Sequence, residues 1–329
     1  MKKHIVFFTI LFFICSCNKQ EKVHQITGSG MGTYYKILYT GKEKSDLLQS
    51  VDSVIQQISS QFSIFDTNSL VARLNRGEVL PLTPDFITVF NASQQVSKIT
   101  DGAFDITVGP LVNLWGFGPN GEKQASVELV DSIKKRVGYQ KVKIEDGVLC
   151  KENSIISLNF NAIAKGFCVD KLSEMMRAKG YQNFMVEVGG EVRTLGNKNG
   201  KPWRIGIQVP TVTADGAFEA NYIFSTDNKS IATSGNYRNY LEKDGVRYAH
   251  TINPKSGYPE QNSLLSVTVL ADESMIADAF ATAFMVLGID ESMKIIEKES
   301  HIEALFIYDE NGILKIKKSA GFPEPLQKR

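Results

Sequence analysis

The spacing of apolar residues predicts helices alternating with hairpins along most of the chain. Apolar residues recur at helical spacing over residues 45–60. A second helix is predicted from Thr83 and Pro84, because a threonine cap followed by proline is typical of the first turn of a helix. Further helices are predicted over residues 126–137, 161–178 and 274–287, ending before glycines 138, 180 and 288.

Short apolar runs separated by turn residues predict strands. Runs on both sides of Glu145-Asp146-Gly147, Lys243-Asp244-Gly245 and Glu310-Asn311-Gly312 predict hairpins. Other strands are predicted over residues 25–28, 33–40, 155–160, 184–188, 203–209, 221–225 and 264–270. Hairpins interspersed with helices favour an α+β fold, with helices packed on mostly antiparallel sheets. Because no repeat or low-complexity linker interrupts residues 25–329, we expect one domain there.

The first 24 residues follow a different pattern. Lys2 and Lys3 precede an apolar run, Ile5 to Ile14, that is shorter than the about 20 residues of a membrane-spanning helix but suits a signal peptide. The run ends in Ile14-Cys15-Ser16-Cys17, which resembles a bacterial lipobox. We therefore expect a signal peptide over residues 1–16, lipidation of Cys17 and a polar tether over 17–24. The alternative is an ordinary secretory signal with a chance cysteine.

Charge and cysteine content narrow the function classes. The chain has 37 Lys and Arg against 36 Asp and Glu, and without Lys2 and Lys3 it stays close to neutral. A near-neutral chain lacks the broad basic field that nucleic-acid binding needs. Cys150 and Cys168 could form a disulfide in an oxidising compartment or remain two separate thiols. No CxxC is present, which argues against a zinc site.

Three segments could carry chemistry. His250 ends a predicted strand and opens a stiff Pro/Gly segment, although a lone histidine is more often structural. Asp278 and Thr282 are four residues apart on a helix, so their oxygens share one face and suit a hard cation such as Mg²⁺. The alternative is a buried aspartate that accepts hydrogen bonds from backbone donors. The third segment, 159–166, joins a strand to a helix N-terminus, a natural site for phosphate, although many asparagines merely cap helices.

Read together, these segments resemble the ApbE family, the FAD:protein FMN transferases. The matching stretches occur in the family's order over about residues 25–290, and as an ordered set they are specific. They are Met31-Gly32-Thr33, Phe62-Ser63-Ile64-Phe65 with Leu74-Asn75, residues 101–118 from Asp101-Gly102-Ala103-Phe104-Asp105 to Gly118, Ile163-Ala164-Lys165-Gly166-Phe167, Val188-Gly189-Gly190, Thr233-Ser234-Gly235-Asn236-Tyr237, His250-Thr251-Ile252-Asn253-Pro254 with Gly257, and Ala277-Asp278 through Thr282.

The resemblance implies an α+β fold that holds FAD in a deep cleft with Mg²⁺ at the pyrophosphate. It implies a metal bound by Asp278, Thr282 and the Ala162 carbonyl, with His250 as the polar group near the diphosphate and His250 or Asp278 as the base. By match, the residues lining the FAD site are Met31, Phe65, Ala103, Phe104, Asp105, Asn159, Lys165 and Ile252.

The activity implied is transfer of FMN from FAD to a threonine of an acceptor flavoprotein, with release of AMP. The acceptors would belong to membrane redox complexes, and the lipid anchor would hold the enzyme on the periplasmic side, at the inner membrane. Two alternatives stay open, an Mg²⁺-dependent FAD pyrophosphatase and a periplasmic flavin-binding lipoprotein without catalysis.

This sequence departs from the family pattern at three positions. Phe65 stands where many members have tyrosine, Asn159 where aspartate is usual, and Ala281 where some members have another carboxylate. The first change keeps a ring for stacking but removes a hydroxyl, and the second removes a charge near the flavin. The third leaves the metal to rely more on phosphate oxygens and water.

Overall fold

The computed structural model describes residues 21–119, 126–209, 222–236, 240–243, 246–249 and 251–326. Its centre is an eight-stranded sheet in which all neighbouring strands are antiparallel. The strand order is β1 (Val23–Gly30), β2 (Thr33–Thr40), β5 (Phe184–Val188), β6 (Glu191–Leu195), β10 (Ser230–Gly235), β13 (Leu264–Ala271), β14 (Glu303–Glu310) and β15 (Ile313–Lys318). The predicted α+β class is confirmed.

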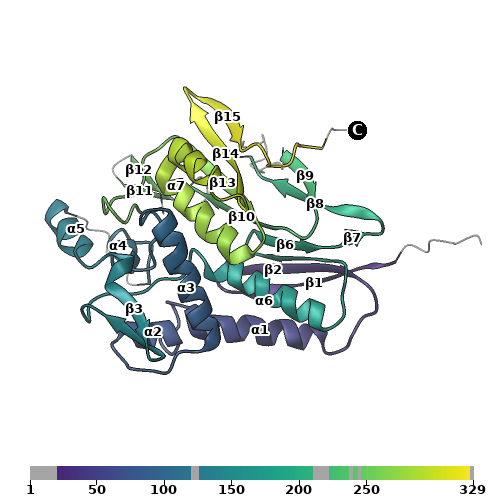
Figure 1. Ribbon diagram of the computed structural model, residues 1–329, viewed down its shortest axis with the longest axis horizontal. Coiled ribbons are helices and arrows are strands. Elements are labelled where there is room, and N and C mark those ends of the chain that lie inside the picture. The colour runs from purple at the N-terminus through teal and green to yellow at the C-terminus, as the bar shows by residue number, and fades with distance from the viewer. Residues whose placement is uncertain are drawn as a thin grey trace, which may run out of the picture.

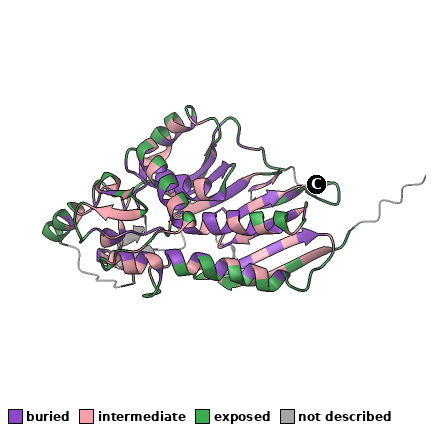
Figure 2. Ribbon diagram, turned by 60° about the horizontal axis from the view of Figure 1, so that its bottom comes forward, coloured by how far each residue is buried: buried purple, intermediate pink, exposed green. Residues whose placement is uncertain are grey.

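Helices cover one face of this sheet and a small sheet covers the other (Figure 1). Four helices pack against the sheet or against one another: α1 (Leu47–Phe62), α3 (Pro84–Ile99), α6 (Ala164–Ala178) and α7 (Ser274–Ile296). Because side chains alternate along a strand, Val186 of β5 joins the core under the helices while its neighbour Met185 joins a second core. That second core lies under β7 (Asn197–Lys198), β8 (Lys201–Ile207) and β9 (Tyr222–Thr226). Figure 2 shows buried positions on the central strands and on the inward sides of the helices.

A group of shorter elements lies beside one end of the sheet, at the left of Figure 1. Its elements are α2 (Leu70–Asn75), α4 (Gly109–Leu114), α5 (Val127–Lys134), the 3₁₀ turn η1 (Tyr139–Lys141), β3 (Val142–Glu145) and β4 (Val148–Lys151). Here Leu111, Leu114, Val130 and Val137 form a small core with Ile252. Ile252 therefore joins this group to the distant segment that follows the hairpin of β11 (Tyr240–Lys243) and β12 (Val246–Ala249).

Several predicted elements differ from the structure. The predicted strand over 155–160 is wrong: the segment is extended and buries Ile156, Leu158 and Phe160, but it joins no sheet. Leu158 in this segment is bonded instead by a side chain, because its amide donates to Asn75 Oδ1 and its carbonyl accepts from Asn75 Nδ2. Apolar residues at alternate positions therefore resembled a strand, although the segment has no partner strand in the described part of the chain.

Helix boundaries also moved, among them the end of α5, which lies at Lys134 rather than 137. Helix α6 begins at Ala164 rather than 161, after a turn over residues 161–163. Helix α7 is broken at Gly288, where φ is +76°, and a second helical stretch follows to Ile296. The predicted end at Gly288 is thus the end of the first stretch, because this left-handed conformation suits glycine.

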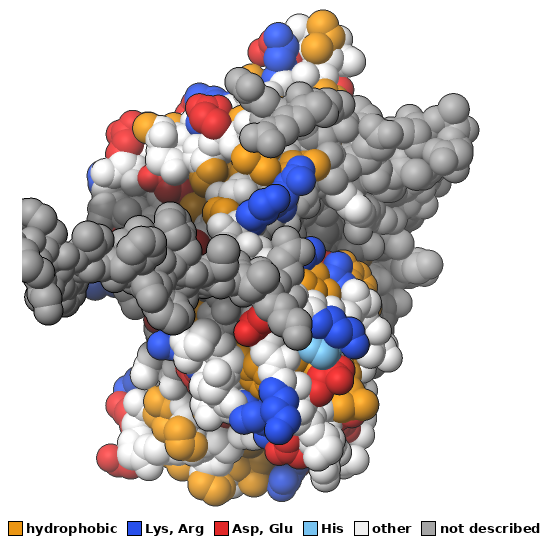
Figure 3. Space-filling model, turned by 90° about the vertical axis from the view of Figure 1, so that its right-hand side faces the viewer, with side chains coloured by type: hydrophobic (Ala, Val, Ile, Leu, Met, Phe, Trp, Pro, Cys, Tyr) orange, Lys and Arg blue, Asp and Glu red, His pale blue; other side chains and the backbone are white. Residues whose placement is uncertain are grey.

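Three further features of the structure concern membrane-spanning helices, surface charge and the two cysteines. No helix among the described residues is long and apolar enough to cross a membrane. On the face shown in Figure 3, lysine and arginine side chains are dispersed among acidic, apolar and neutral ones. Cys150 and Cys168 are both free thiols, and burial raises the pKa of Cys168 to about 12. The structure therefore has no bridge between these two cysteines.

Candidate active site

A cavity of about 810 Å³ lies where the large sheet meets the shorter elements, with a volume in the range of small-ligand sites. Its wall combines the start of α6, the first half of α7, the turn between β5 and β6, and strand β10. A loop over residues 103–105, parts of β2 and β8, and Thr251, Ile252 and Pro254 also line it. Segments far apart in the sequence therefore converge on one hollow.

Asp278 and Thr282 both face this cavity from α7. Asp278 is 2% exposed, and its Oδ2 accepts a hydrogen bond of 3.0 Å from the Gly166 amide. Thr282 Oγ1 lies 3.1 Å from Ser234 Oγ on β10. The two oxygens predicted to share a helix face do so because the remaining positions around them are apolar and pack into the core.

The amino end of α6 meets Asp278 because Gly166 allows two helices to touch. A Cβ on Gly166 would collide with the Ser274 carbonyl at the start of α7. Gly166 is the third residue of α6, so its amide has no acceptor within the helix and is free for Asp278. The carboxylate therefore lies at the positive end of the α6 dipole.

Lys165 lies between two buried carboxylates. Its Nζ is 2.9 Å from Glu191 Oε1 and 3.5 Å from Asp278 Oδ1. Burial by itself would lower the pKa of Lys165, but the charges of Asp278 and Glu191 outweigh it and hold that pKa above its usual value. Burial raises the pKa of Glu191 to about 7, although Lys165 opposes the shift. The cluster holds one cation and two acidic groups.

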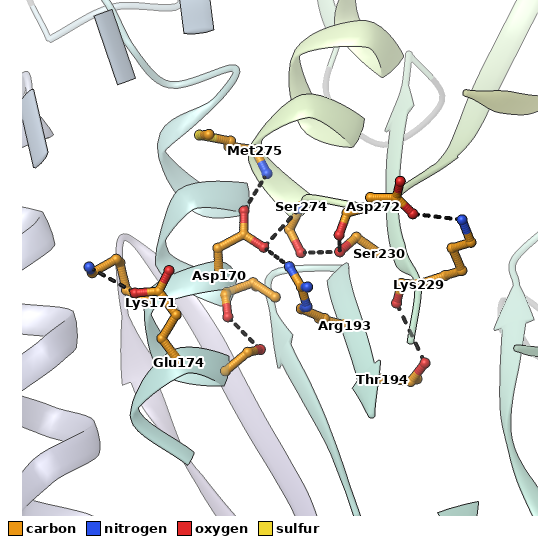
Figure 4. A network of polar contacts seen from close by, with 12 residues as sticks. Asp170, Lys171, Glu174, Arg193, Thr194, Lys229, Ser230, Asp272, Ser274 and Met275 are labelled. Carbon is orange, nitrogen blue, oxygen red and sulfur yellow. Dashed lines mark hydrogen bonds and ion pairs between the residues drawn. The ribbon is translucent and has the colours of Figure 1, made fainter. Parts of the chain in front are cut away.

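Another buried carboxylate fixes the start of α7 (Figure 4). Asp170 on α6 accepts from the amides of Ser274 and Met275, each at 2.9 Å, and from Arg193 Nη1 at 2.7 Å. The residue before α7, Glu273, makes no side-chain cap. Burial raises the pKa of Asp170, and these three donors oppose the shift. Asp170 thus caps α7 from a neighbouring helix and positions the helix that carries Asp278.

The loop over 103–107 is held by its own aspartate. Asp105 Oδ1 accepts from the amide and the hydroxyl of Thr107, at 2.7 and 2.6 Å, while Oδ2 accepts from the Tyr139 amide at 2.8 Å. Burial raises the pKa of Asp105, against these hydrogen bonds. Asn159 is bonded to this loop, because its backbone N–H donates to the Ile106 carbonyl. Both oxygens of Asp105 are therefore used to shape the cavity wall.

The oxygen donors fit a hard divalent cation, provided that a ligand completes its coordination. Within the described part of the chain, Asp278 Oδ1 has only the 3.5 Å contact with Lys165, so it retains lone pairs for a metal. Thr282 adds a hydroxyl from the same face, and Ala162 lines the cavity nearby. Among the described residues, no group of three His, Cys, Asp or Glu side chains could hold a metal. Phosphate oxygens and water would have to supply the other ligands.

Most predicted site residues come together in the cavity, and some do not. The residues that line it are Ala103, Phe104, Asp105, Asn159, Ala162, Lys165, Ile252, Asp278 and Thr282. Met31 lies outside this lining, in the β1–β2 turn, where its sulfur accepts from Ser59 Oγ. Phe65 is 64% exposed and also lies outside it, although its neighbour Ile64 lines a smaller hollow that shares Asn159 with the cavity. His250 and Cys17 fall outside the described residues.

Two positions were missed in the sequence. Glu191 directly follows Gly189 and Gly190, and the motif that pointed to this stretch contains the two glycines but not the glutamate. Asp170 lies inside a predicted helix, where the sequence does not distinguish a functional aspartate from an ordinary polar residue. A weak signal was present for Asp170, because it lies on the same helical face as the buried Phe167.

Comparisons with known proteins show which family this chain is similar to. A family model described as the ApbE family matches residues 31–306. The FAD:protein FMN transferase of Haemophilus influenzae is 37% identical, covering 93% of each chain. That of Vibrio cholerae is 35% identical, covering 98% of this chain and 99% of the relative.

Solved structures give the same result. The flavin transferase ApbE from Vibrio cholerae superposes with a TM-score of 0.83 and 34% identity, covering 92% of this chain and 99% of that one. The apo form of Pseudomonas stutzeri flavinyl transferase ApbE gives 0.82 and 36%, covering 92% and 96%. The predicted enzyme class, a transferase, is confirmed by these relatives. The chain belongs to the ApbE family, as its ordered motifs predicted.

Proposed function

We propose that the protein is an Mg²⁺-dependent FAD:protein FMN transferase. In this reaction a threonine hydroxyl of an acceptor flavoprotein attacks the phosphorus of the FMN half of FAD. The bond between that phosphorus and the bridging oxygen breaks, AMP leaves, and a phosphoester to threonine forms. The observation that carries the proposal is the convergence of Asp278, Thr282 and Lys165 with the amino end of α6 on one cavity of about 810 Å³.

The chain's own groups suit a diphosphate. Lys165 brings a positive charge to the cavity wall beside Glu191 and Asp278, and the amino end of the α6 dipole adds a partial one. Mg²⁺ bound by Asp278, Thr282 and the Ala162 carbonyl would neutralise the phosphates when present. Aligned cationic groups of this kind lower the barrier to phosphoryl transfer chiefly by positioning and by charge stabilisation.

The acceptor hydroxyl needs a base, because a threonine hydroxyl is a poor nucleophile near neutral pH. His250 and Asp278 are the two candidates from the sequence. Thr251 and Ile252, which directly follow His250 in the chain, line the cavity. Because Asp278 would bind the metal, we assign to His250 the role of the base that takes the proton of the acceptor hydroxyl.

Phe65 offers a test of how the ligand's rings are bound. Its side chain is exposed, so Phe65→Ala should leave the midpoint of thermal unfolding unchanged. If the ring stacks on FAD, the variant should lose about 1–3 kcal/mol of FAD binding, as for other ring stacking, and raise Kd about 5- to 150-fold. Quenching of flavin fluorescence measures Kd, and Phe65→Tyr is the matched control that keeps the ring. Equal affinity in all three proteins would remove Phe65 from the site.

We also propose that the protein is lipid-anchored at Cys17 on the periplasmic side of the inner membrane, near acceptors in membrane redox complexes. An anchor raises the effective concentration of enzyme at such acceptors. Cys17→Ser should move the protein from the membrane fraction to the soluble fraction, while Cys15→Ser should leave it membrane-bound. Membrane association of the Cys17→Ser protein would contradict the anchor.

The deciding experiment is product analysis. The purified protein is incubated with FAD, Mg²⁺ and a candidate acceptor domain, and the products are separated. A covalently fluorescent acceptor together with AMP supports the transferase. AMP and free FMN without a labelled acceptor would make the protein a hydrolase, and FAD bound unchanged would make it a binding protein.

A further inference from the structure

The contacts of Lys165 with its two acidic neighbours are unequal. The ammonium makes a full hydrogen bond of 2.9 Å to Glu191 Oε1, whereas its contact with Asp278 Oδ1, at 3.5 Å, is at the limit of a hydrogen bond. Lys165 is therefore bound to Glu191 and only close to Asp278. This asymmetry is what a metal site at Asp278 requires.

An ammonium and a divalent cation compete for the same carboxylate lone pairs. If Lys165 were bound to Asp278 alone, a metal could take Asp278 only by leaving a largely buried ammonium without a partner, which is costly. A second carboxylate removes that cost, because it keeps Lys165 paired when Asp278 binds the metal. Glu191 is in the position to do this.

The fold places Glu191 by a tight turn. Gly189 and Gly190 have φ of +61° and +108°, conformations that other residues rarely adopt, and a Cβ on Gly189 would crowd the side chain of Thr33. The turn sets Glu191 as the first residue of β6, with its side chain in the cavity wall and 3% of the residue exposed.

Folding stability does not explain why a carboxylate occupies the buried position 191. Among the described residues, Glu191 Oε2 is buried without a hydrogen-bond partner, and an unsatisfied buried carboxylate oxygen carries a cost to folding. Glu187, two residues before the turn, contrasts with it. That glutamate also lines the cavity, but both of its oxygens have partners, Tyr34 and Lys36.

We propose that Glu191 is a positioning residue that holds the Lys165 ammonium away from Asp278 and so keeps the Asp278 carboxylate free for a divalent cation. This inference rests on the proposed function, since it takes Asp278 as the metal ligand. Its consequence is specific: the effect of Glu191 on metal binding acts through Lys165 and disappears when Lys165 has no charge.

Metal binding without FAD provides the first test. Binding of Mn²⁺ to the purified protein is followed by EPR of the free ion. Glu191→Gln should weaken binding about 10- to 100-fold, the usual effect of residues that support a metal ligand. Glu187→Gln, which removes the same charge from the same cavity wall, should change it by less than about threefold.

The double variant makes the test specific. Lys165→Met should bind Mn²⁺ at least as tightly as the wild type, and Lys165→Met/Glu191→Gln should match Lys165→Met within about threefold. A double variant that stays as weak as Glu191→Gln would overturn the role, because Glu191 would then act without Lys165.

A metal-free measurement separates this inference from the proposed metal site. The coupling between Lys165 and Asp278 is obtained from unfolding of Lys165→Met, Asp278→Asn and the pair. In the Glu191→Gln background the coupling constant should rise at least about tenfold. An unchanged coupling would overturn the role of Glu191. Absence of wild-type Mn²⁺ binding would instead remove the proposed metal site.

Discussion

Asp278→Asn should lower the rate of flavin transfer at least about a thousandfold, equivalent to ~4 kcal/mol of transition-state stabilisation. Asp278 is the single carboxylate in the proposed set of metal ligands, whose other members are a hydroxyl and a carbonyl. Asparagine has nearly the same shape and keeps an oxygen for the Gly166 amide, which now donates to Asp278 Oδ2. The variant therefore loses the charge and little else.

The fold should survive this change. Lys165 remains paired with Glu191 at 2.9 Å, so no buried ammonium is left without a partner. The midpoint of thermal unfolding without metal should stay within a few degrees of the wild type. The rate is measured by the appearance of covalently bound flavin fluorescence and of AMP at saturating FAD and Mg²⁺.

Thr282 supplies the matched controls for this prediction. Thr282→Ser keeps the hydroxyl that faces Ser234 and should retain most activity, whereas Thr282→Val keeps the shape without the oxygen and should lose most of it. If Asp278→Asn transferred flavin at a rate within about threefold of the wild type, the cation would be bound elsewhere or not needed.

Asp170→Ala should destabilise the protein by about 3–5 kcal/mol, the usual cost of breaking a buried pair. The change removes the acceptor for Arg193 and for the amides of Ser274 and Met275 at once. Those two amides begin α7 and have no intrahelical acceptor, so their loss is not replaced within the helix.

The measurement is urea-induced unfolding followed by tryptophan fluorescence. Glu174→Ala is the control, because Glu174 is an exposed neighbour whose pair with Lys171 is worth little. The loss of stability in Asp170→Asn should lie between the losses in Asp170→Ala and Glu174→Ala. The asparagine oxygen can still accept a hydrogen bond, but its N–H groups would face the remaining donors. A loss below about 1 kcal/mol in Asp170→Ala would show that α7 is positioned by packing alone.

Local pattern determined a large part of the fold. The start of α3 was predicted from Thr83 and Pro84, and Thr83 Oγ1 does accept from the Phe86 amide. The helices that carry apolar stripes and the hairpins with Asp-Gly or Asn-Gly turns were found within a few residues. These features depend on neighbours three or four positions away, which a sequence displays directly.

The sequence by itself determined the family, the α+β class and the shared face of Asp278 and Thr282, because these follow from ordered motifs and from helical spacing. Only the tertiary structure decided that Glu191 on β6 pairs with Lys165 and that Asp170 on α6 caps α7. It also decided that β6 and β10 lie side by side in the sheet, and that Leu158 is bonded to the Asn75 side chain rather than to a strand. The physical reason is that burial, ion pairing and strand order depend on residues distant in the chain, and no local pattern records which distant segments will touch.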